Sequence, residues 1–501
     1  MKLYSIPVLC QTGFAAERVY SLTYNRLFPI LRLSEIEGIL IIPPPLVGIS
    51  ANLTKIPLPW WEGTKGRGNS LFQGIQYTFW EENVELRLEC HDKIIQLIDK
   101  GVHIPNPLSL DIGDDVDINQ ISSDGVKIYP GCRIYGGKTV IAAGAQIGHE
   151  GPVTIENCQI GPNVELKDGY FSKAVFLEKA NMGLGAHIRE GCILEEESNG
   201  AHCVGLKQTI LFPFVTLGSL INFCDCLMAG GTSRKDHSEV GSSYIHFNFS
   251  PDGDKTTPSL IGDVPRGVML NQPRIFLGGQ GGIIGPVRIG YGNIVAAGTI
   301  LRKDSLEDNK LIVGKTHRAV ITDFVPKLYP GLSRVVENNM IYIANLMALE
   351  QWYMNVRRPF FILQEFGELI YDGVLNNLEL AKKERIKRLR MLADNLADFN
   401  KNNELDSRVV SRKREVYERI DQVCDLFSEE IAVKAGEKYR DRFLSAFEDS
   451  KNQNPGNYVE MIQNLPSNVS QEGTRWLKQI IDEVCQESSA ILPLMNLFKK
   501  M

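Results

Sequence analysis

Residues 287–301 read VRIGYGNIVAAGTIL, and this stretch contains the pattern that decides the fold of the middle of the chain. Ile289 is followed by a glycine, and the next aliphatic anchor, Ile294, is followed closely by alanine and glycine. The same pairing of an aliphatic residue with a glycine occurs upstream, for example at Ile112 and Ile160. A small residue allows the backbone to turn a tight corner. The pattern therefore indicates short strands joined by sharp turns.

The spacing between these anchors is often six residues, as from Ile112 to Ile118, from Ile128 to Ile134 and from Ile134 to Val140. Neither an amphipathic helix nor an alternating strand has this period. A triangular coil does, because each side is one short strand whose aliphatic residue points inward. Such coils bury their interior only by stacking on one another. We therefore predict a left-handed parallel β-helix of hexapeptide repeats, a handedness that departs from the usual rule for parallel strands.

Glycine usage marks the expected domain boundaries. Of the 45 glycines, 32 fall between Gly101 and Gly314, and none of the five tryptophans lies there. The shift in composition predicts three regions. They are a small N-terminal mixed α/β region with a lead-in helix (1–100), the β-helix (101–322) and a C-terminal all-α bundle (323–501).

Apolar residues three and four positions apart predict helices on both sides of the β-helix. Nothing in the C-terminal helical sequence favours a substrate-binding role over a regulatory or oligomerising one. The hexapeptide pattern blurs at Leu206–Asp236 and Gly278–Gly285, where we expect loops that leave the β-helix. The expected helices span residues 82–100, 335–356, 361–399, 407–431, 435–447 and 471–485.

Composition argues against several classes of protein. The net charge of −6 gives no reason to expect a nucleic-acid partner, and we interpret the basic run Lys382–Arg390 as a solvated helix face. No stretch reaches the roughly 18–20 apolar residues of a membrane span, and the N-terminus is a poor signal peptide. Ten cysteines are scattered, and Cys224 and Cys226 have no second pair for a zinc site. We expect a cytoplasmic protein without a metal centre.

The two ends of the predicted β-helix resemble a known enzyme family. The stretch GVHIPNPLSLDIGDDVDI at residues 101–118 resembles the entry into the β-helix of the bifunctional N-acetylglucosamine-1-phosphate uridylyltransferase/glucosamine-1-phosphate acetyltransferase. Residues 287–301 are similar to that family's last coils, where an IAAGT segment lies beside acetyl-CoA. The resemblance covers residues 82–320 and implies the acetyltransferase half alone. Stand-alone relatives labelled "UDP-N-acetylglucosamine pyrophosphorylase" exist, but the N-terminal region before the predicted β-helix has no LxGGxG-type phosphate loop to support that label.

The resemblance implies a substrate site. The arginine and the lysine that grip the sugar phosphate in the family correspond to Arg189 and Lys207, which stand at the same spacing. The family's asparagine-tyrosine-aspartate-glycine turn, and the lysine shortly after it, are similar to the segment that begins at Asn248 and to Lys255. Two cations at matching spacing favour a phosphate-binding role.

The resemblance also implies a site for the acyl donor. The alanine whose backbone meets the acetyl carrier corresponds to Ala297, and the basic residue that meets the coenzyme's phosphate corresponds to Lys315. β-helices of this family complete each site from neighbouring subunits. The resemblance therefore implies a homotrimer with acetyl-CoA between two chains, on threefold cyclic symmetry.

One position departs from the family pattern. The family's catalytic histidine lies in a Gly-His-Leu-Thr-Tyr segment, which corresponds to GSLIN at residues 218–222. Ser219 thus replaces the general base and Asn222 the substrate-binding tyrosine. Because histidine suits proton transfer near neutral pH, His237 and His246 are the candidates for the base. The alternative is that His237 is a solvated loop residue and His246 a residue of the coil surface.

Two functions remain open from the sequence. The first is an acyl-CoA-dependent acyltransferase, with acetyl as the expected group, acting on a phosphorylated or nucleotide-linked amino sugar. The second is a non-catalytic β-helix that binds a sugar nucleotide and signals this binding through the helical domain. The lost family histidine and the large helical domain favour the second function. Neither function requires nucleic acid or a membrane.

Overall fold

The computed structural model describes residues 88–314, 319–397, 407–453 and 456–499, together with four short strands near the N-terminus. Contacts divide the chain into two units, Met1–Val84 and Glu85–Met501. The β-helix and the C-terminal helices belong to the same unit, and the three-region division stays a prediction. The smaller unit contains two antiparallel strand pairs, β1 (Val8–Leu9) with β2 (Ala15–Ala16) and β3 (Tyr20–Thr23) with β4 (Arg26–Pro29).

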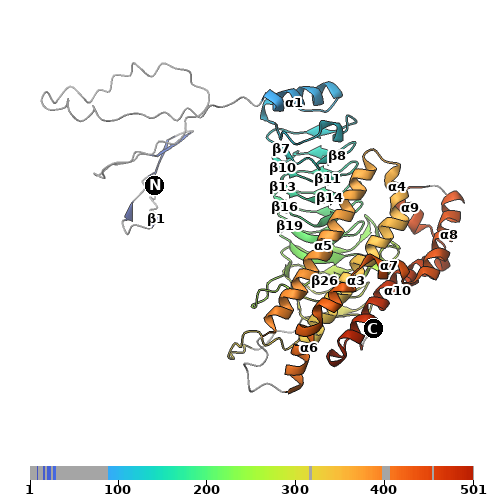
Figure 1. The fold of residues 1–501 in the computed structure, drawn as a ribbon. Coiled ribbons are helices and arrows are strands. Elements are labelled where there is room, and N and C mark those ends of the chain that lie inside the picture. The colour runs from blue at the N-terminus through green and yellow to red at the C-terminus, as the bar shows by residue number, and fades with distance from the viewer. Residues whose placement is uncertain are drawn as a thin grey trace, which may run out of the picture. The chain divides into compact units, whose positions relative to one another are not determined.

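The larger unit begins with helix α1 (Leu88–Lys100), which leads into a solenoid of short parallel strands (Figure 1). Its first coils contain two 3-10 turns, Pro107–Ser109 and Ile118–Gln120. Each strand in the interior of the solenoid pairs with strands one coil before and one coil after it. The predicted parallel β-helix is confirmed.

The solenoid has three faces, which we name A, B and C in the order in which the chain visits them. Face A consists of β5 (Asp111–Ile112), β7 (Arg133–Tyr135), β10 (Val153–Glu156), β13 (Gly169–Ser172), β16 (Ala186–Ile188), the first halves of β19 (Gly205–Leu211) and β21 (Asn222–Met228), β25 (Ile245–Phe247), β28 (Gly282–Ile284) and β31 (Ile300–Leu301). Face B consists of β8 (Val140–Ile141), β11 (Gln159–Ile160), β14 (Ala174–Phe176), β17 (Cys192–Leu194), the second halves of β19 and β21, β26 (Ser259–Ile261) and β29 (Arg288–Ile289). Face C consists of β6 (Lys127–Ile128), β9 (Gln146–Ile147), β12 (Glu165–Leu166), β15 (Asn181–Met182), β18 (Asn199–Gly200), β20 (Thr216–Leu217), β24 (Glu239–Val240), β27 (Phe276–Leu277), β30 (Ile294–Val295) and β32 (Leu311–Ile312).

Buried residues of the face-A strands point into the solenoid and stack on their equivalents in the neighbouring coils. This inward column includes Ile188, Leu206, Phe223, His246 and Ile283, all at most 2% exposed. Removal of such apolar surface from water stabilises the stack by about 25 cal/mol per Å². His246 is the exception in this column, because it is a polar residue at an aliphatic position.

Two long strands explain why the hexapeptide pattern blurs in the sequence. β19 and β21 continue from face A to face B, passing the corner at Gln208 and Asp225, where φ is +49° and +59°. The expected loop at Leu206–Asp236 is therefore wrong over most of its length. The expected loop at Gly278–Gly285 is also wrong, because β28 lies there and pairs with β25 and β31.

Among the described residues, the first segment that leaves the solenoid lies at the end of the expected loop Leu206–Asp236, and the others lie after it. A hairpin of β22 (Gly231–Ser233) and β23 (Asp236–His237) projects between faces B and C. A loop at residues 248–258 projects between faces A and B, and residues 262–274 contain the short helix α2 (Val264–Gly267).

The C-terminal region is helical, as expected, although the helix predicted at 361–399 begins only at Gly367. No described helix is long and apolar enough to cross a membrane. The elements are α3 (Leu332–Trp352), a π-helical turn (Tyr353–Arg357), α4 (Arg358–Ile362), α5 (Gly367–Asn395), α6 (Ser407–Asp425), α7 (Glu429–Lys434), α8 (Glu437–Gln453), α9 (Tyr458–Gln463), α10 (Ser467–Ile491) and a 3-10 turn (Pro493–Met495).

Helices α3 and α5 cover face B of the solenoid (Figure 1). α5 contacts β11, β14 and β17, and α3 contacts β26. The Asn377 side chain on α5 donates to the Cys192 carbonyl at 3.1 Å. Five consecutive outward side chains of face B are apolar and at most 3% exposed, namely Val175, Ile193, Ile210, Leu227 and Leu260, and the polar residues Gln159 and Arg288 flank them. By contrast, faces A and C present exposed outward side chains such as Ile245 and Ile294.

Candidate functional site

Strands β16 and β19 bring Arg189 and Lys207 together on the outer side of face A. Ile188 pairs with Leu206, so the two cationic residues that follow are also in register. Neighbouring strands lie about 4.8 Å apart. The Lys207 Nζ lies 2.7 Å from Glu190 Oε1. Burial raises the pKa of Glu190, but Lys207 and Arg189 outweigh it, so this pKa is lowered overall.

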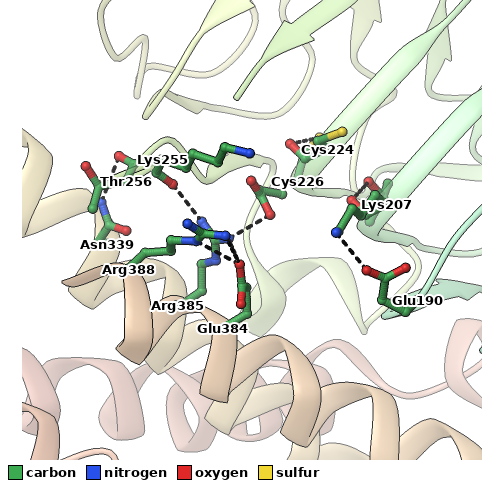
Figure 2. A network of polar contacts seen from close by, with 12 residues as sticks. Glu190, Lys207, Cys224, Cys226, Lys255, Thr256, Asn339, Glu384, Arg385 and Arg388 are labelled. Atoms are coloured by element: carbon green, nitrogen blue, oxygen red, sulfur yellow. Dashed lines mark hydrogen bonds and ion pairs between the residues drawn. The ribbon is translucent and has the colours of Figure 1, made fainter. Parts of the chain in front are cut away.

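The loop after β25 adds Lys255 to this group. Its backbone is held at both ends of the residue: Lys255 N donates to Ser250 Oγ at 2.9 Å, and Arg385 Nη1 donates to Lys255 O at 3.2 Å. Figure 2 shows the Lys255 side chain extending toward the strand that carries Cys224. Asn248, at the start of the same loop, is half-buried.

Helix α5 places two guanidinium groups at the same corner (Figure 2). Arg385 Nη2 lies 2.8 Å from Asp225 Oδ1, and both side chains are at most 5% exposed. Burial raises the pKa of Asp225, and Arg385 opposes that rise. Arg388 Nη2 pairs with Glu384 Oε1 at 2.6 Å. We call the five cations at this corner between faces A and B the basic corner: Arg189, Lys207, Lys255, Arg385 and Arg388.

A shallow hollow of about 540 Å³ lies on face A. Arg189 and Asn222 both line it, so the structure brings these two predicted substrate residues together. Asn222 is exposed and stands next to Gly205 in register, two residues before the Lys207 column. The other side chains that line the hollow include His187, Cys203 and Leu220.

The corner between faces C and A holds Ser219 and Ala297. Backbone hydrogen bonds of 2.8–3.0 Å connect successive coils along this corner, for example from Ser243 N to Ser219 O and from Gly298 N to Gly279 O. Three coil steps separate Ser219 from Ala297, or about 14 Å along the solenoid. Lys315 lies outside the described residues. The residues that stack along this corner in successive coils are, in order, His202, Ser219, Ser242, Gly279 and Ala297.

His246 lies inside the solenoid rather than on its surface. The side chain is 2% exposed, its Nε2 is 2.7 Å from Ser259 Oγ, and its ring packs edge-on against Phe223. Burial lowers the pKa of His246 to about 4. The ring is therefore neutral at pH 7 and is separated from the hollow by its own strand. This placement favours a packing role, and a catalytic role for His246 stays a prediction.

His237 lies on the hairpin between faces B and C. Its Nδ1 is 2.8 Å from the Arg234 carbonyl, and its Nε2 is 3.8 Å from Glu239 Oε2. The basic corner lies between faces A and B, so the structure does not bring His237 together with Arg189 and Lys207. A role as the base likewise stays a prediction.

Sequence reasoning missed the helical contribution to the basic corner. Arg385 is 2% exposed and Lys382 is 8% exposed, so the interpretation of this run as a solvated face is wrong for both residues. Their spacing of three residues could have indicated a shared buried side, because it places both side chains on one side of the helix. His202 was also missed, because the residue that it contacts, Ser219, belongs to the next coil.

No group of three or more histidine, cysteine, aspartate or glutamate side chains within the described ranges lies close enough to hold a metal ion. Cys224 points outward beside Lys207, and burial raises the pKa of its thiol. Cys226, two residues later, is fully buried inside the coil.

The chain is similar to curated proteins over nearly half of its length. It is 29% identical over 248 residues to the Bifunctional protein GlmU of Thermotoga maritima, which is 49% of this chain and 48% of that relative. It is 28% identical over 248 residues to the protein of the same name from Thermotoga petrophila, again 49% and 48% of the two chains. The protein of that name from Trichlorobacter lovleyi is 27% identical over 219 residues, 44% of this chain and 42% of that relative.

These names confirm the resemblance to the bifunctional family that the sequence indicated. The chain spans about half the length of the curated relatives that it matches. No family model matches the chain.

Proposed function

We propose that the solenoid is an acyltransferase domain that transfers an acetyl group from acetyl-CoA to a phosphorylated or nucleotide-linked amino sugar. The observation that supports this proposal best is the basic corner, where three separate segments place cations beside one hollow. Arg189 and Lys207 come from adjacent coils, and Lys255 comes from a loop more than forty residues later. The chain as a whole has a net charge of −6, so this gathering of cations is local.

The dimensions of face A fit such a substrate. The columns that contain Asn222 and Lys207 are two residues apart along the strand direction, or about 7 Å. In the proposed pose the phosphate contacts Arg189, Lys207 and Lys255 at the basic corner. The sugar ring then crosses the hollow toward the corner between faces C and A, and its amino group lies near Asn222. Charge-assisted hydrogen bonds to the phosphate provide most of the affinity in this pose.

The acyl donor is proposed to lie along the corner between faces C and A. Gly279 and Ala297 belong to this corner, and Ala297 is exposed, so its backbone is accessible to a thioester chain. A backbone N–H directed at the thioester oxygen stabilises the charge that develops there during acyl transfer. Lys315 would contact a phosphate of the coenzyme.

We further propose a homotrimer of about 170 kDa, since face B is already covered by α3 and α5. Two uncovered faces carry exposed apolar side chains that a subunit interface would bury, among them Leu184, Leu220, Ile245, Phe247, Ile294 and Ile300. The nine described cysteines are all unpaired, which fits the reducing cytoplasm.

The test is release of the coenzyme thiol from acetyl-CoA in the presence of a panel of amino-sugar phosphates and nucleotide sugars. Transfer that depends on one phosphorylated amino sugar supports the enzyme. Tight binding of a sugar nucleotide without any thiol release supports the non-catalytic alternative. That second function has one structural observation in its favour, because Arg385 links helix α5 directly to the loop that carries Lys255.

A further inference from the structure

The proposed acyl transfer requires a base, and the position of the family's histidine is occupied by Ser219. An attacking amine loses a proton as its bond to the acyl carbon forms, and a positioned base accelerates this step. A serine hydroxyl has no proton affinity to spare at neutral pH. The residue that completes the site must therefore lie within hydrogen-bond reach of Ser219 or of the hollow itself.

The coil before Ser219 contains such a group. His202 Nδ1 lies 2.9 Å from Ser219 Oγ, within the range of a hydrogen bond. The two residues are fixed in this relation by their backbones, because Leu220 N donates to His202 O at 3.0 Å. Ser219 is held from the opposite side as well, where its N–H donates to Ser242 Oγ at 3.2 Å.

The pair stands at the edge of the hollow on face A. Cys203 and Leu220, which follow His202 and Ser219 directly in the chain, both line the hollow. Asn222, three residues after Ser219, lies on its floor. Arg189 lines the same hollow on the side of the basic corner. A substrate whose phosphate contacts Arg189 therefore extends toward the pair of His202 and Ser219.

The other histidines nearby are less suited to this task. His246 is enclosed in the solenoid and His237 lies at the opposite corner, as described above. His187 lines the hollow, but its ring packs edge-on against Tyr170 of the preceding coil, and His187 lies two coils away from Ser219. His202 combines exposure to the hollow's edge with a hydroxyl that it orients.

We infer that His202 is the general base of the proposed transfer and acts through Ser219, so that the imidazole missing at position 219 is supplied from the preceding coil. This inference rests on the proposed function. The substrate amine attacks the thioester carbon, a C–N bond forms and the C–S bond breaks. The amine proton passes to Ser219 Oγ, whose own proton passes to His202 Nδ1. The imidazolium then returns a proton to the thiolate that leaves, so atoms and charge balance.

The test compares single variants in the acetyl-CoA assay. His202→Ala and Ser219→Ala should each lower kcat by about 10²–10⁴-fold with little change in KM, because both remove proton transfer and neither removes the phosphate contacts. The ascending limb of the wild-type pH profile should disappear in His202→Ala, and added imidazole should restore part of its activity. His149→Ala is the matched control and should keep wild-type kcat, because His149 is exposed and does not line the hollow. An unchanged melting temperature in each variant excludes a folding defect.

A reconstruction tests the geometry independently. The double variant His202→Ala/Ser219→His places an imidazole directly at position 219 and should recover activity that His202→Ala alone has lost. Full activity in His202→Ala overturns the assignment of the base and leaves the proposed function intact. If His187→Ala loses activity while His202→Ala retains it, His187 rather than His202 is the base. Absence of acyl transfer in the wild type overturns the proposed function, and the base assignment with it.

Discussion

Replacement of His246 by leucine is predicted to remove a loss of stability at acidic pH. His246 occupies an aliphatic position of the inward column, between Phe223 and Ile283. Leucine fills that position without an ionisable group. Ser259 Oγ, the present partner of His246, still accepts a hydrogen bond from Val287 N at 3.0 Å, so its hydroxyl is not left without a partner.

The magnitude follows from the lowered pKa. Burial lowers the pKa of His246 from 6.5 to about 4, so the unfolded chain binds more protons than the folded chain between these values. Stability is therefore lost as pH falls through this window and is fully present above pH 6.5. At pH 4.5 the linkage relation gives a loss of about 2–3 kcal/mol from this one group.

A second buried group, Glu195, changes stability with pH in the opposite direction. The quantity to measure is therefore the difference in unfolding free energy between the variant and the wild type. Burial raises the pKa of Glu195 from 4.5 to about 7, although Arg357 opposes the rise. The folded state then holds a proton that the unfolded state releases, and this contribution to stability is present at low pH and is lost as pH rises through about 7. Because Glu195 is the same in both proteins, its effect cancels when wild type and variant are compared.

The assay is chemical denaturation of the wild type and of His246→Leu at several pH values from 7.5 to 4.5. We expect the stability difference, variant minus wild type, to increase by about 2–3 kcal/mol over this range. His187→Leu serves as the control, because His187 is exposed and should show no comparable change. If the wild type and His246→Leu lose stability in parallel as pH falls, His246 is not held neutral inside the solenoid.

Three further predictions concern the corner, the ligand and the assembly. Arg385→Ala should destabilise the fold by about 3–5 kcal/mol in denaturant titrations, because it leaves Asp225 buried without its cation. Arg388→Ala, which breaks a pair that solvent reaches, should cost less than about 1 kcal/mol, and equal losses would contradict the argument. Lys207→Ala should weaken binding of a phosphorylated amino sugar by about 1.5–3 kcal/mol in calorimetry while the melting temperature barely changes. Light scattering should give about three times the chain mass of 56.1 kDa, and a monomer at micromolar concentration would count against a site shared between subunits.

The sequence also indicates which face of the solenoid is covered by helices, although the six-residue spacing does not. The strands of face B read AVF, CIL, TIL, CLM and SLI, and all three residues of each are buried. Strands that are buried on both sides read as continuous apolar runs, whereas half-exposed strands alternate. The strand IHF on face A alternates between exposed and buried residues. These runs therefore predict that helices pack against face B.

The sequence alone was sufficient for the parallel β-helix and for the helical C-terminal region. These features depend on a six-residue spacing and on apolar residues three and four positions apart, which can be counted along the chain. The pairing of Arg189 with Lys207 was implied by the family resemblance, and the structure places the two residues in adjacent coils. Which residues stack in adjacent coils was decided only by the tertiary structure, because the coils differ in length. The step from His202 to Ser219 takes 17 residues, but the step from Ser219 to Ser242 takes 23, since the hairpin of β22 and β23 lies within it. The side of the strand on which His246 lies was also decided there, since a shift of one residue in register moves a side chain from solvent to the interior.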